Sequence, residues 1–349
     1  MKRDTNISKG NFISKEESVM LQAIAVMLMV FHHLFGFPER IQVPYALVLD
    51  FEFLHIETIL SYWGRICISI FAFCSGYGLY KVGKEKLLDG YKIVIKRLQK
   101  FYSRYWMICL VFVPIGYALR VYKFNSLTLI KSLLGLSSSY NKEWWYVGTY
   151  LGLLLWYPVV FCLMTWIHKK TGKYSILISG IIWVVISIAY GLLEEKGFWC
   201  WFLCFTMGMY AVQHNIFEMV YDNLQKMKAF KYILTIICFA GIYVVRSILV
   251  GTCNYDYIFT PIVIFCILVI LKCKICLRFT KKILSVVGKY STYIWLIHTF
   301  FAYYYFQKFT FWVKYSWLIL IWCLLCCVMI GVVLEYIVQW IERKTFIRK

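Results

Sequence analysis

The sequence predicts an all-α protein that crosses a membrane about ten times, with both termini on the cytoplasmic side. Of its 349 residues, 62% are apolar and only 16% are charged, and the mean hydropathy is +0.69. Soluble domains are closer to half apolar and a quarter charged. The surface of a water-soluble fold could not be covered with so few polar residues, so a bilayer must be the solvent for most of the chain.

Ten apolar stretches are candidates for membrane-spanning helices, each of which needs about 20 residues. They are residues 19–37, 58–80, 105–122, 145–167, 175–193, 198–213, 232–250, 256–271, 290–307 and 316–340. We expect one integral membrane domain over residues 1–349, with short cytoplasmic tails at 1–18 and 341–349.

The distribution of basic residues predicts the orientation. Of the 38 Lys and Arg, 28 fall in segments predicted to lie inside and 7 in outer loops. Cytoplasmic loops of membrane proteins collect Lys and Arg. The net charge of +21 is therefore explained without a nucleic-acid partner, and the protein is expected in the cell membrane as a multi-pass protein.

The cysteines indicate neither a disulfide framework nor a metal site. Most of the 14 lie in apolar runs, where they behave as small hydrophobic residues. Cys273 and Cys276 form a lone CxxC pair, and a structural zinc site needs two further ligands. No bound metal is expected.

Three imidazoles lie in predicted spans. His32 and His33 are in the outer half of the first span, and His298 is near the middle of the ninth. Neighbouring helix positions differ by about 100°, so His32 and His33 cannot face the same direction. Ionisable groups at this depth are costly and mark functional sites by default.

The second predicted span carries Arg65, for which Glu52 or Glu57 in the preceding loop is a possible partner. The alternative for Arg65 is a purely structural ion pair. Near the other end of the span, Ser75 and Gly76 form a small-residue step that permits close approach by a neighbouring helix or by a ligand.

Three cations precede the third span. Arg97, Lys100 and Arg104 occur at i, i+3 and i+7 and so share one helix face at the inner membrane surface. Phosphates are natural counter-ions for such a cluster. Contact with anionic lipid headgroups is the alternative interpretation.

Five segments in order resemble the acyltransferase-3 family of integral membrane O-acyltransferases. They are LQAIAVMLMVFHH (21–33), IFAFCSGYGL (70–79), KRLQKFYSRYW (96–106), EWWYVGTYLGLLLWYP (143–158) and VGKYSTYIWLIH (287–298). Two positions depart from the family pattern. Gln22 stands eleven residues before His33, where the family usually has Arg, and Lys100 replaces a second arginine of the basic motif.

The resemblance implies transfer of an acyl group, usually acetyl from acetyl-CoA, to a hydroxyl of a cell-surface or exported polysaccharide. His33 best matches the family's essential histidine. It would act as general base or carry the acyl group covalently, and the residues do not separate these alternatives. His32, His298 and Arg65 complete the expected catalytic set.

The remaining site residues are expected to bind the two substrates. Acyl-CoA, a co-substrate rather than a bound cofactor, would contact a first set of residues: Arg97, Lys100, Arg104, Ser75 and Gly76. The sugar acceptor would contact a second set: Trp145, Tyr146, Glu57 and Ser291.

Two other classes of protein fit the composition. A secondary transporter or lipid-linked glycan exporter is the main alternative, but such proteins are often built from repeats with broken helices, and the sequence shows no repeat. A membrane scaffold without enzymatic activity would not explain why the ionisable residues His33, His298 and Arg65 lie in predicted spans.

Overall fold

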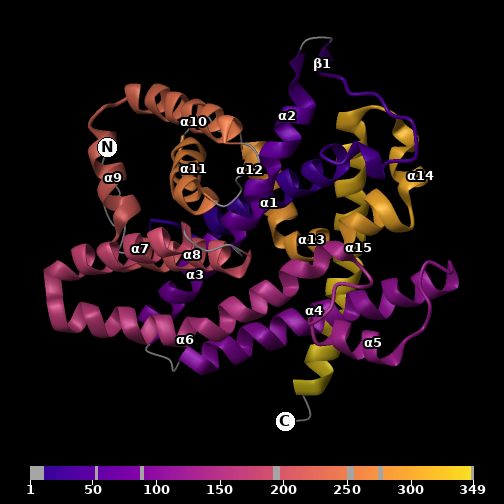
Figure 1. Ribbon diagram of the computed structural model, residues 1–349, viewed down its shortest axis with the longest axis horizontal. Helices are drawn as coiled ribbons and strands as arrows, with labels where there is room; N and C mark the ends of the chain where they lie inside the picture. Colours follow the sequence, from indigo (N-terminus) through magenta and orange to yellow (C-terminus); the bar gives the residue numbers. More distant parts are fainter. Residues whose placement is uncertain are drawn as a thin grey trace. The chain divides into compact units, whose positions relative to one another are not determined.

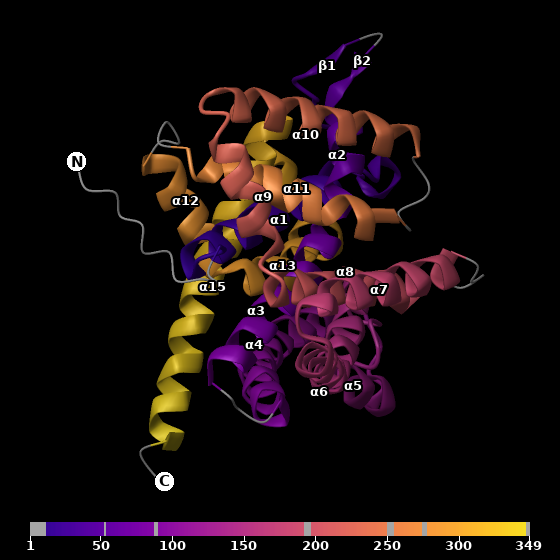
Figure 2. The same cartoon turned by 90° about the vertical axis from the view of Figure 1, so that its left-hand side faces the viewer.

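The computed structural model describes residues 12–51, 54–86, 90–191, 197–249, 255–273 and 278–346, and these are almost entirely helical (Figures 1 and 2). The chain forms two compact units, each assembled from three segments. The first comprises Met1–Gln22, Ile68–Val94 and Leu153–Ser285. The second comprises Ala23–Cys67, Ile95–Gly152 and Val286–Lys349.

The elements from the N-terminus to α7 begin with α1 (Lys15–Phe35) and the 3₁₀ turn η1 (Pro38–Arg40). A short hairpin, β1 (Asp50–Phe51) with β2 (Leu54–His55), leads into α2 (Ile56–Trp63), η2 (Gly64–Ile66) and α3 (Cys67–Lys86). Next come α4 (Gly90–Ala118), α5 (Ser126–Leu133), η3 (Lys142–Trp144), α6 (Trp145–Thr171), η4 (Gly172–Tyr174) and α7 (Ser175–Gly191).

The C-terminal half continues with α8 (Gly197–Gln213), α9 (Ile216–Gln225), α10 (Phe230–Ile248) and α11 (Asp256–Leu271). Then come α12 (Arg278–Lys289), α13 (Ser291–Thr299) and one π-helical turn, Phe300–Tyr304. The last elements are α14 (Gln307–Thr310), η7 (Phe311–Val313) and α15 (Ser316–Phe346).

In the part of the chain that the structure describes, each of the ten predicted apolar stretches lies mainly on helical structure. Among the described residues, five helical stretches are long and apolar enough to cross a membrane: Lys15–Phe35, Ile56–Lys84, Lys142–Tyr190, Phe230–Ile248 and Ser316–Lys344. The multi-pass membrane character is therefore confirmed, while the count of ten crossings and the cytoplasmic termini stay predictions.

Two predicted spans are not continuous α-helices. The second is divided by the 3₁₀ turn η2 at Gly64, where an added Cβ would lie 2.4 Å from the Leu28 carbonyl oxygen. The ninth begins directly after α12 ends at Lys289, and its helix α13 gives way to the π-turn after Thr299. A π-turn inserts an extra residue into a helix and often occurs at functional sites.

In the first unit, α8 packs against α7 and α11, and α10 packs against α11 (Figure 1). Helices α3 and α8 approach each other closely at two glycines, Gly76 and Gly208. A Cβ on Gly76 would lie 1.9 Å from the Phe205 carbonyl oxygen, and one on Gly208 would lie 2.2 Å from the Phe73 carbonyl oxygen. Of the two roles expected for Gly76, the structure shows contact with a neighbouring helix. Ser75, beside it, is half-buried.

Gly76→Ala is expected to destabilise the protein by about 1–3 kcal/mol, because overpacking a tight contact forces the two helices apart. Thermal unfolding in detergent measures the loss. Gly241→Ala is the matched control, since an added Cβ at this helical position meets nothing within 4 Å. Equal melting temperatures for the two variants would contradict the close crossing of α3 and α8.

Candidate active site

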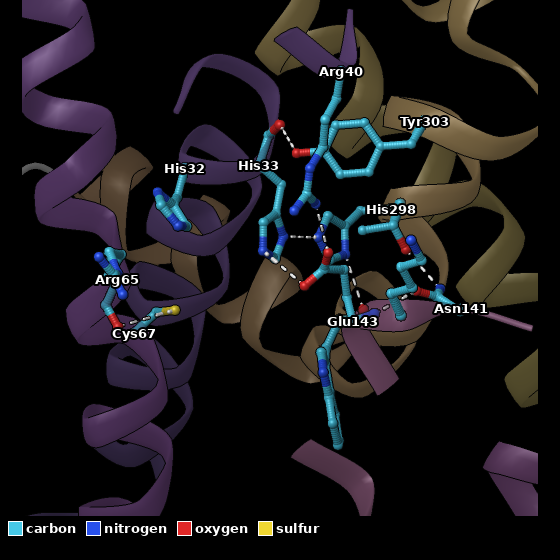
Figure 3. Close-up of polar contacts among 12 residues, drawn as sticks. His32, His33, Arg40, Arg65, Cys67, Asn141, Glu143, His298 and Tyr303 are labelled. Atoms are coloured by element: carbon cyan, nitrogen blue, oxygen red, sulfur yellow. Dashed lines mark hydrogen bonds and ion pairs between the residues drawn. The ribbon is translucent and has the colours of Figure 1, made fainter. Parts of the chain in front are cut away.

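Two histidines that are 265 residues apart in sequence meet in the second unit. His33 lies near the end of α1 and His298 near the end of α13, and Nδ1 of His33 is 2.6 Å from Nε2 of His298. The rings are nearly parallel, with an interplanar angle of 12° and centroids 4.9 Å apart. Figure 3 shows His33 facing His298. The structure therefore joins two of the imidazoles singled out in the sequence.

Backbone carbonyls determine where the protons of this pair lie. Nδ1 of His298, which is fully buried, is 2.9 Å from the carbonyl oxygens of both Ile294 and Trp295. A carbonyl oxygen only accepts hydrogen bonds, so Nδ1 of His298 must carry the proton and Nε2 its lone pair. That lone pair accepts the hydrogen bond from Nδ1 of His33. In its neutral form, His33 consequently has a free lone pair on Nε2.

A carboxylate faces this free nitrogen. Oε2 of Glu143 is 3.6 Å from Nε2 of His33, and Oε1 of Glu143 accepts a hydrogen bond of 2.9 Å from Nη1 of Arg40. The guanidinium of Arg40 also lies over the rings of Phe37 and Tyr303, at 4.3 and 5.4 Å. Arg40 thus fixes one oxygen of the carboxylate and leaves the other for His33.

The surroundings of Arg40 favour its charged form. Partial burial acts to lower the pKa of its guanidinium, but the hydrogen bond with Glu143 and the charge of that carboxylate raise the pKa above its ordinary value. Arg40 therefore keeps its positive charge beside the imidazoles.

Asn141 positions Glu143 with respect to α13. The Asn141 side-chain oxygen accepts from the Glu143 backbone N–H at 3.0 Å, and its amide nitrogen donates to Oγ1 of Thr299 at 2.6 Å. Asn141 is fully buried. Close by, the indole N–H of Trp144 donates to the Leu296 carbonyl oxygen at 3.0 Å. Two side chains thus tie the turn that carries the carboxylate to the helix that carries His298.

The π-turn Phe300–Tyr304 contributes a further support. The Tyr303 hydroxyl donates to the backbone carbonyl oxygen of His33. Gln307, just beyond the turn, donates through Nε2 to the Arg40 carbonyl oxygen at 3.0 Å. The wider turn after His298 therefore brings side chains to both α1 and η1, and it gives the site a defined geometry.

The His32 side chain points away from the His33–His298 pair, as expected because neighbouring helix positions differ by about 100°. Nδ1 of the buried His32 lies 2.8 Å from the Ser61 carbonyl oxygen and donates to it, which joins α1 to α2. Its ring also borders Gly36, where an added Cβ would lie 2.8 Å from Nδ1 of His32. The contacts of His32 are those of a residue that packs two helices together.

Arg65 and Glu57 are not brought together with the imidazole pair. Arg65 is exposed on η2, and Figure 3 shows its side chain away from His33 and His298. Glu57 is fully buried and accepts a hydrogen bond of 2.6 Å from Oγ of Ser316. Glu52, the other partner considered for Arg65, lies outside the described residues.

The three predicted cations on α4 differ in their surroundings. Arg104 forms an ion pair of 2.6 Å with Oε1 of Glu335 and donates to the Lys100 carbonyl oxygen at 2.8 Å. Arg97 is half-buried and interacts with the Tyr150 hydroxyl, whereas Lys100 is exposed. Arg104 is thus paired with a carboxylate, which distinguishes it from the other two cations of the cluster.

Three of the four residues predicted to bind the acceptor lie in α13 or at the start of α6, whereas Glu57 lies in α2. Tyr146 is buried with its ring centroid 5.6 Å from that of Trp295, and Trp145 is partly exposed. Ser291 is buried as the first residue of α13, two turns before His298.

A metal site is not evident in the part of the chain that the structure describes, because no three His, Cys, Asp or Glu side chains gather there as ligands. Cys276, the second cysteine of the CxxC pair, lies outside the described residues.

Sequence reasoning missed four residues of the site: Arg40, Asn141, Glu143 and Tyr303. Glu143 carried one signal, since it directly precedes the paired tryptophans of the fourth predicted span. The other three are polar or aromatic residues in or near loops, and their importance comes only from contacts across the chain.

Comparison with known proteins gives one match that covers most of the chain. A family model described as an acyltransferase domain (Acyl_transf_3) matches residues 20–337. No curated protein and no solved structure matches.

Proposed function

Because this chain belongs to the acyltransferase-3 family and is a membrane acyltransferase, we propose that it transfers an acetyl group from acetyl-CoA to a hydroxyl of a cell-surface or exported polysaccharide. Membership of an acyltransferase family favours this chemistry over transport. The observation that carries the proposed mechanism is the fixed chain of contacts from His298 through His33 to Glu143.

In this mechanism, Nε2 of His33 is the general base. The acceptor hydroxyl donates its hydrogen bond to this lone pair, and its oxygen attacks the thioester carbonyl carbon while the proton moves to His33. When the C–S bond breaks, the imidazolium returns the proton to the departing CoA thiolate. His298 is a positioning residue, since it fixes which nitrogen of His33 carries the lone pair.

Glu143 would act when His33 becomes charged. Its carboxylate is 3.6 Å from Nε2, so it faces the imidazolium proton that forms during attack. An interaction that strengthens as charge develops lowers the barrier to reaction instead of tightening substrate binding. Arg40 holds the carboxylate in place for this purpose.

The donor would bind through its phosphates to Arg97 and Lys100. Both lie in the same unit as the histidine pair, and Arg97 is half-buried, as expected for a residue that contacts a ligand. Arg104 would support this face through its ion pair with Glu335. The acceptor would approach His33 past Arg40, whose side chain is 40% exposed.

The proposal is tested with the purified protein in nanodiscs, acetyl-CoA labelled in the acetyl group, and a panel of oligosaccharides. We expect label on a sugar in a linkage that mild alkali releases, which identifies an ester. Release of acetate without transfer to any sugar, or transfer to an amine, would contradict the proposal.

Arg97→Ala is expected to raise KM for acetyl-CoA about tenfold and to leave kcat nearly unchanged, since a charge-assisted hydrogen bond to phosphate is lost. Lys308→Ala, which removes an exposed cation elsewhere in the same unit, is the matched control. An unchanged KM in the Arg97 variant would assign this residue to lipid headgroups.

A further inference from the structure

Helix α12 carries charge of one sign only. Its charged side chains are Arg278, Lys281, Lys282 and Lys289, and its sequence RFTKKILSVVGK contains no acidic residue. Among the residues that the structure describes, no carboxylate forms an ion pair with any of these four cations. The positive charge of α12 is therefore available to an anionic partner.

Three of the cations point to the same side of the helix. Arg278, Lys282 and Lys289 are all exposed. At about 100° per residue, separations of four and seven residues bring their directions within about 40° of one another. We call these three residues the basic stripe. Because α12 is one continuous helix, the arrangement depends on the geometry of this helix alone.

An apolar stripe lies beside the basic stripe on the exposed surface of α12. It consists of Phe279, Ile283 and Val286, at i, i+4 and i+7, which are 71%, 42% and 45% exposed. At the same angle per residue, this stripe is the next one around the helix from the basic stripe. The side beyond it carries Leu284 and Val287, which are buried. Helix α12 thus packs on the protein through one side and presents cations and apolar groups together on another.

The position of α12 in the chain puts this surface at the edge of the predicted membrane region. The helix ends at Lys289, and the ninth predicted span begins at the next residue, Tyr290. Nζ of Lys289 is 5.2 Å from the centroid of the Tyr290 ring. Tyrosine is enriched where helices enter a bilayer, and an excess of Lys and Arg is typical of the cytoplasmic side.

Cations beside an exposed apolar stripe are typical of a helix that lies in a membrane surface, with its apolar groups at the boundary of the acyl chains. We propose that α12 is such an interfacial helix and that its basic stripe binds the anionic lipid headgroups of the cytoplasmic leaflet. A dissolved anion would contact the cations but leave the apolar stripe in water, whereas a lipid surface accommodates both. None of the residues assigned to acyl transfer lies on α12, so the proposal is independent of the proposed function.

The test uses the full chain in phosphatidylcholine nanodiscs that contain a small fraction of a photoreactive lipid. Two probes carry the same diazirine close to the glycerol end of the acyl chain, and one is a phosphatidylglycerol whereas the other is a phosphatidylcholine. Labelled peptides are then mapped. We expect the anionic probe to label α12 about tenfold more strongly than the neutral probe, since each basic residue near an anionic surface strengthens binding.

Substitution of the basic stripe tests the headgroup contact. The triple variant Arg278→Gln, Lys282→Gln and Lys289→Gln should label equally with the two probes. The matched control removes three other exposed cations, with the substitutions Lys123→Gln, Lys131→Gln and Lys308→Gln, and should keep the tenfold preference. All six positions are exposed, so both variants should fold as the wild type does.

Substitution of the apolar stripe tests the contact with acyl chains. Phe279→Ser should lower the labelling of α12 by both probes about threefold or more, because less apolar surface leaves the water. Phe124→Ser is the matched control, since Phe124 is also 71% exposed and belongs to a different part of the chain. It should leave the labelling of α12 unchanged.

Four outcomes would overturn the proposal. Equal labelling of wild-type α12 by the two probes would indicate ordinary contact with the bilayer, and an unchanged preference in the triple variant would remove the basic stripe from headgroup binding. Loss of the preference on addition of acetyl-CoA would assign the stripe to the donor. Loss of the preference on addition of inorganic phosphate would assign it to a free anion.

Discussion

His33→Ala is expected to abolish acyl transfer while the protein still accumulates in the membrane. The variant loses the lone pair that accepts the hydroxyl proton, and general-base catalysis alone contributes about 10²- to 10⁴-fold. His33 contacts neighbours mainly through the atoms used in catalysis, so its removal should spare the fold. Transfer of labelled acetyl to the sugar acceptor measures the effect.

His55→Ala provides the matched control for this experiment. His55 is an exposed imidazole in the hairpin before α2, where it pairs with Asp50 at 2.9 Å. It should retain full activity. Unchanged transfer by the His33 variant would remove His33 from the mechanism. Stable acetylation of His33 in the absence of acceptor would replace general-base catalysis by covalent catalysis.

Glu143→Gln is expected to lower kcat about 10²- to 10³-fold, the loss typical when one preorganised electrostatic contact is removed from an active site. Glutamine keeps the size of the side chain and an oxygen that can accept from Arg40, but it lacks the negative charge that faces Nε2 of His33. KM for acetyl-CoA should stay unchanged, because Glu143 is not assigned to donor binding. Steady-state kinetics in nanodiscs separates the two constants.

Glu39→Gln controls for a general change of charge near Arg40. Glu39 is mainly exposed and lies 4.0 Å from Nε of Arg40, so it approaches the same guanidinium without reaching His33. Equal activities of the two glutamine variants would contradict the role of Glu143, because its carboxylate would then serve only as a tether.

Much of the fold could be predicted from hydropathy alone. The first helix ends at Phe35, close to the predicted end at 37, and Pro38 follows, a residue that cannot continue a helix. Helix α4 begins at Gly90, well before the apolar span predicted to start at 105, because the basic stretch that carries Arg97, Lys100 and Arg104 is itself helical. Hydropathy detects only the apolar part of such a helix.

The sequence did not indicate that the α-helix is interrupted in the second and ninth predicted spans. The interruptions depend on close backbone contact at Gly64 and on the π-turn after His298, and neither changes the hydropathy of the segment. Local sequence preferences do not report such tertiary effects.

The candidate site could be predicted in part. The cost of burying imidazole in a membrane singled out His33 and His298, which the structure places in direct contact. The same argument singled out Arg65, which is exposed and lies apart from His33 and His298. The cost of burial in a membrane did not single out Glu143, because this residue precedes the predicted span. The tertiary fold brings it to His33.

The most direct test is a structure of the wild-type protein with an uncleavable thioether analogue of acetyl-CoA and a sugar acceptor. The mechanism predicts the reacting hydroxyl within hydrogen-bond reach of Nε2 of His33, about 2.6–3.2 Å, and the analogue's carbonyl carbon about 3–3.5 Å from the hydroxyl oxygen. An acceptor hydroxyl bound with no access to that nitrogen would contradict it.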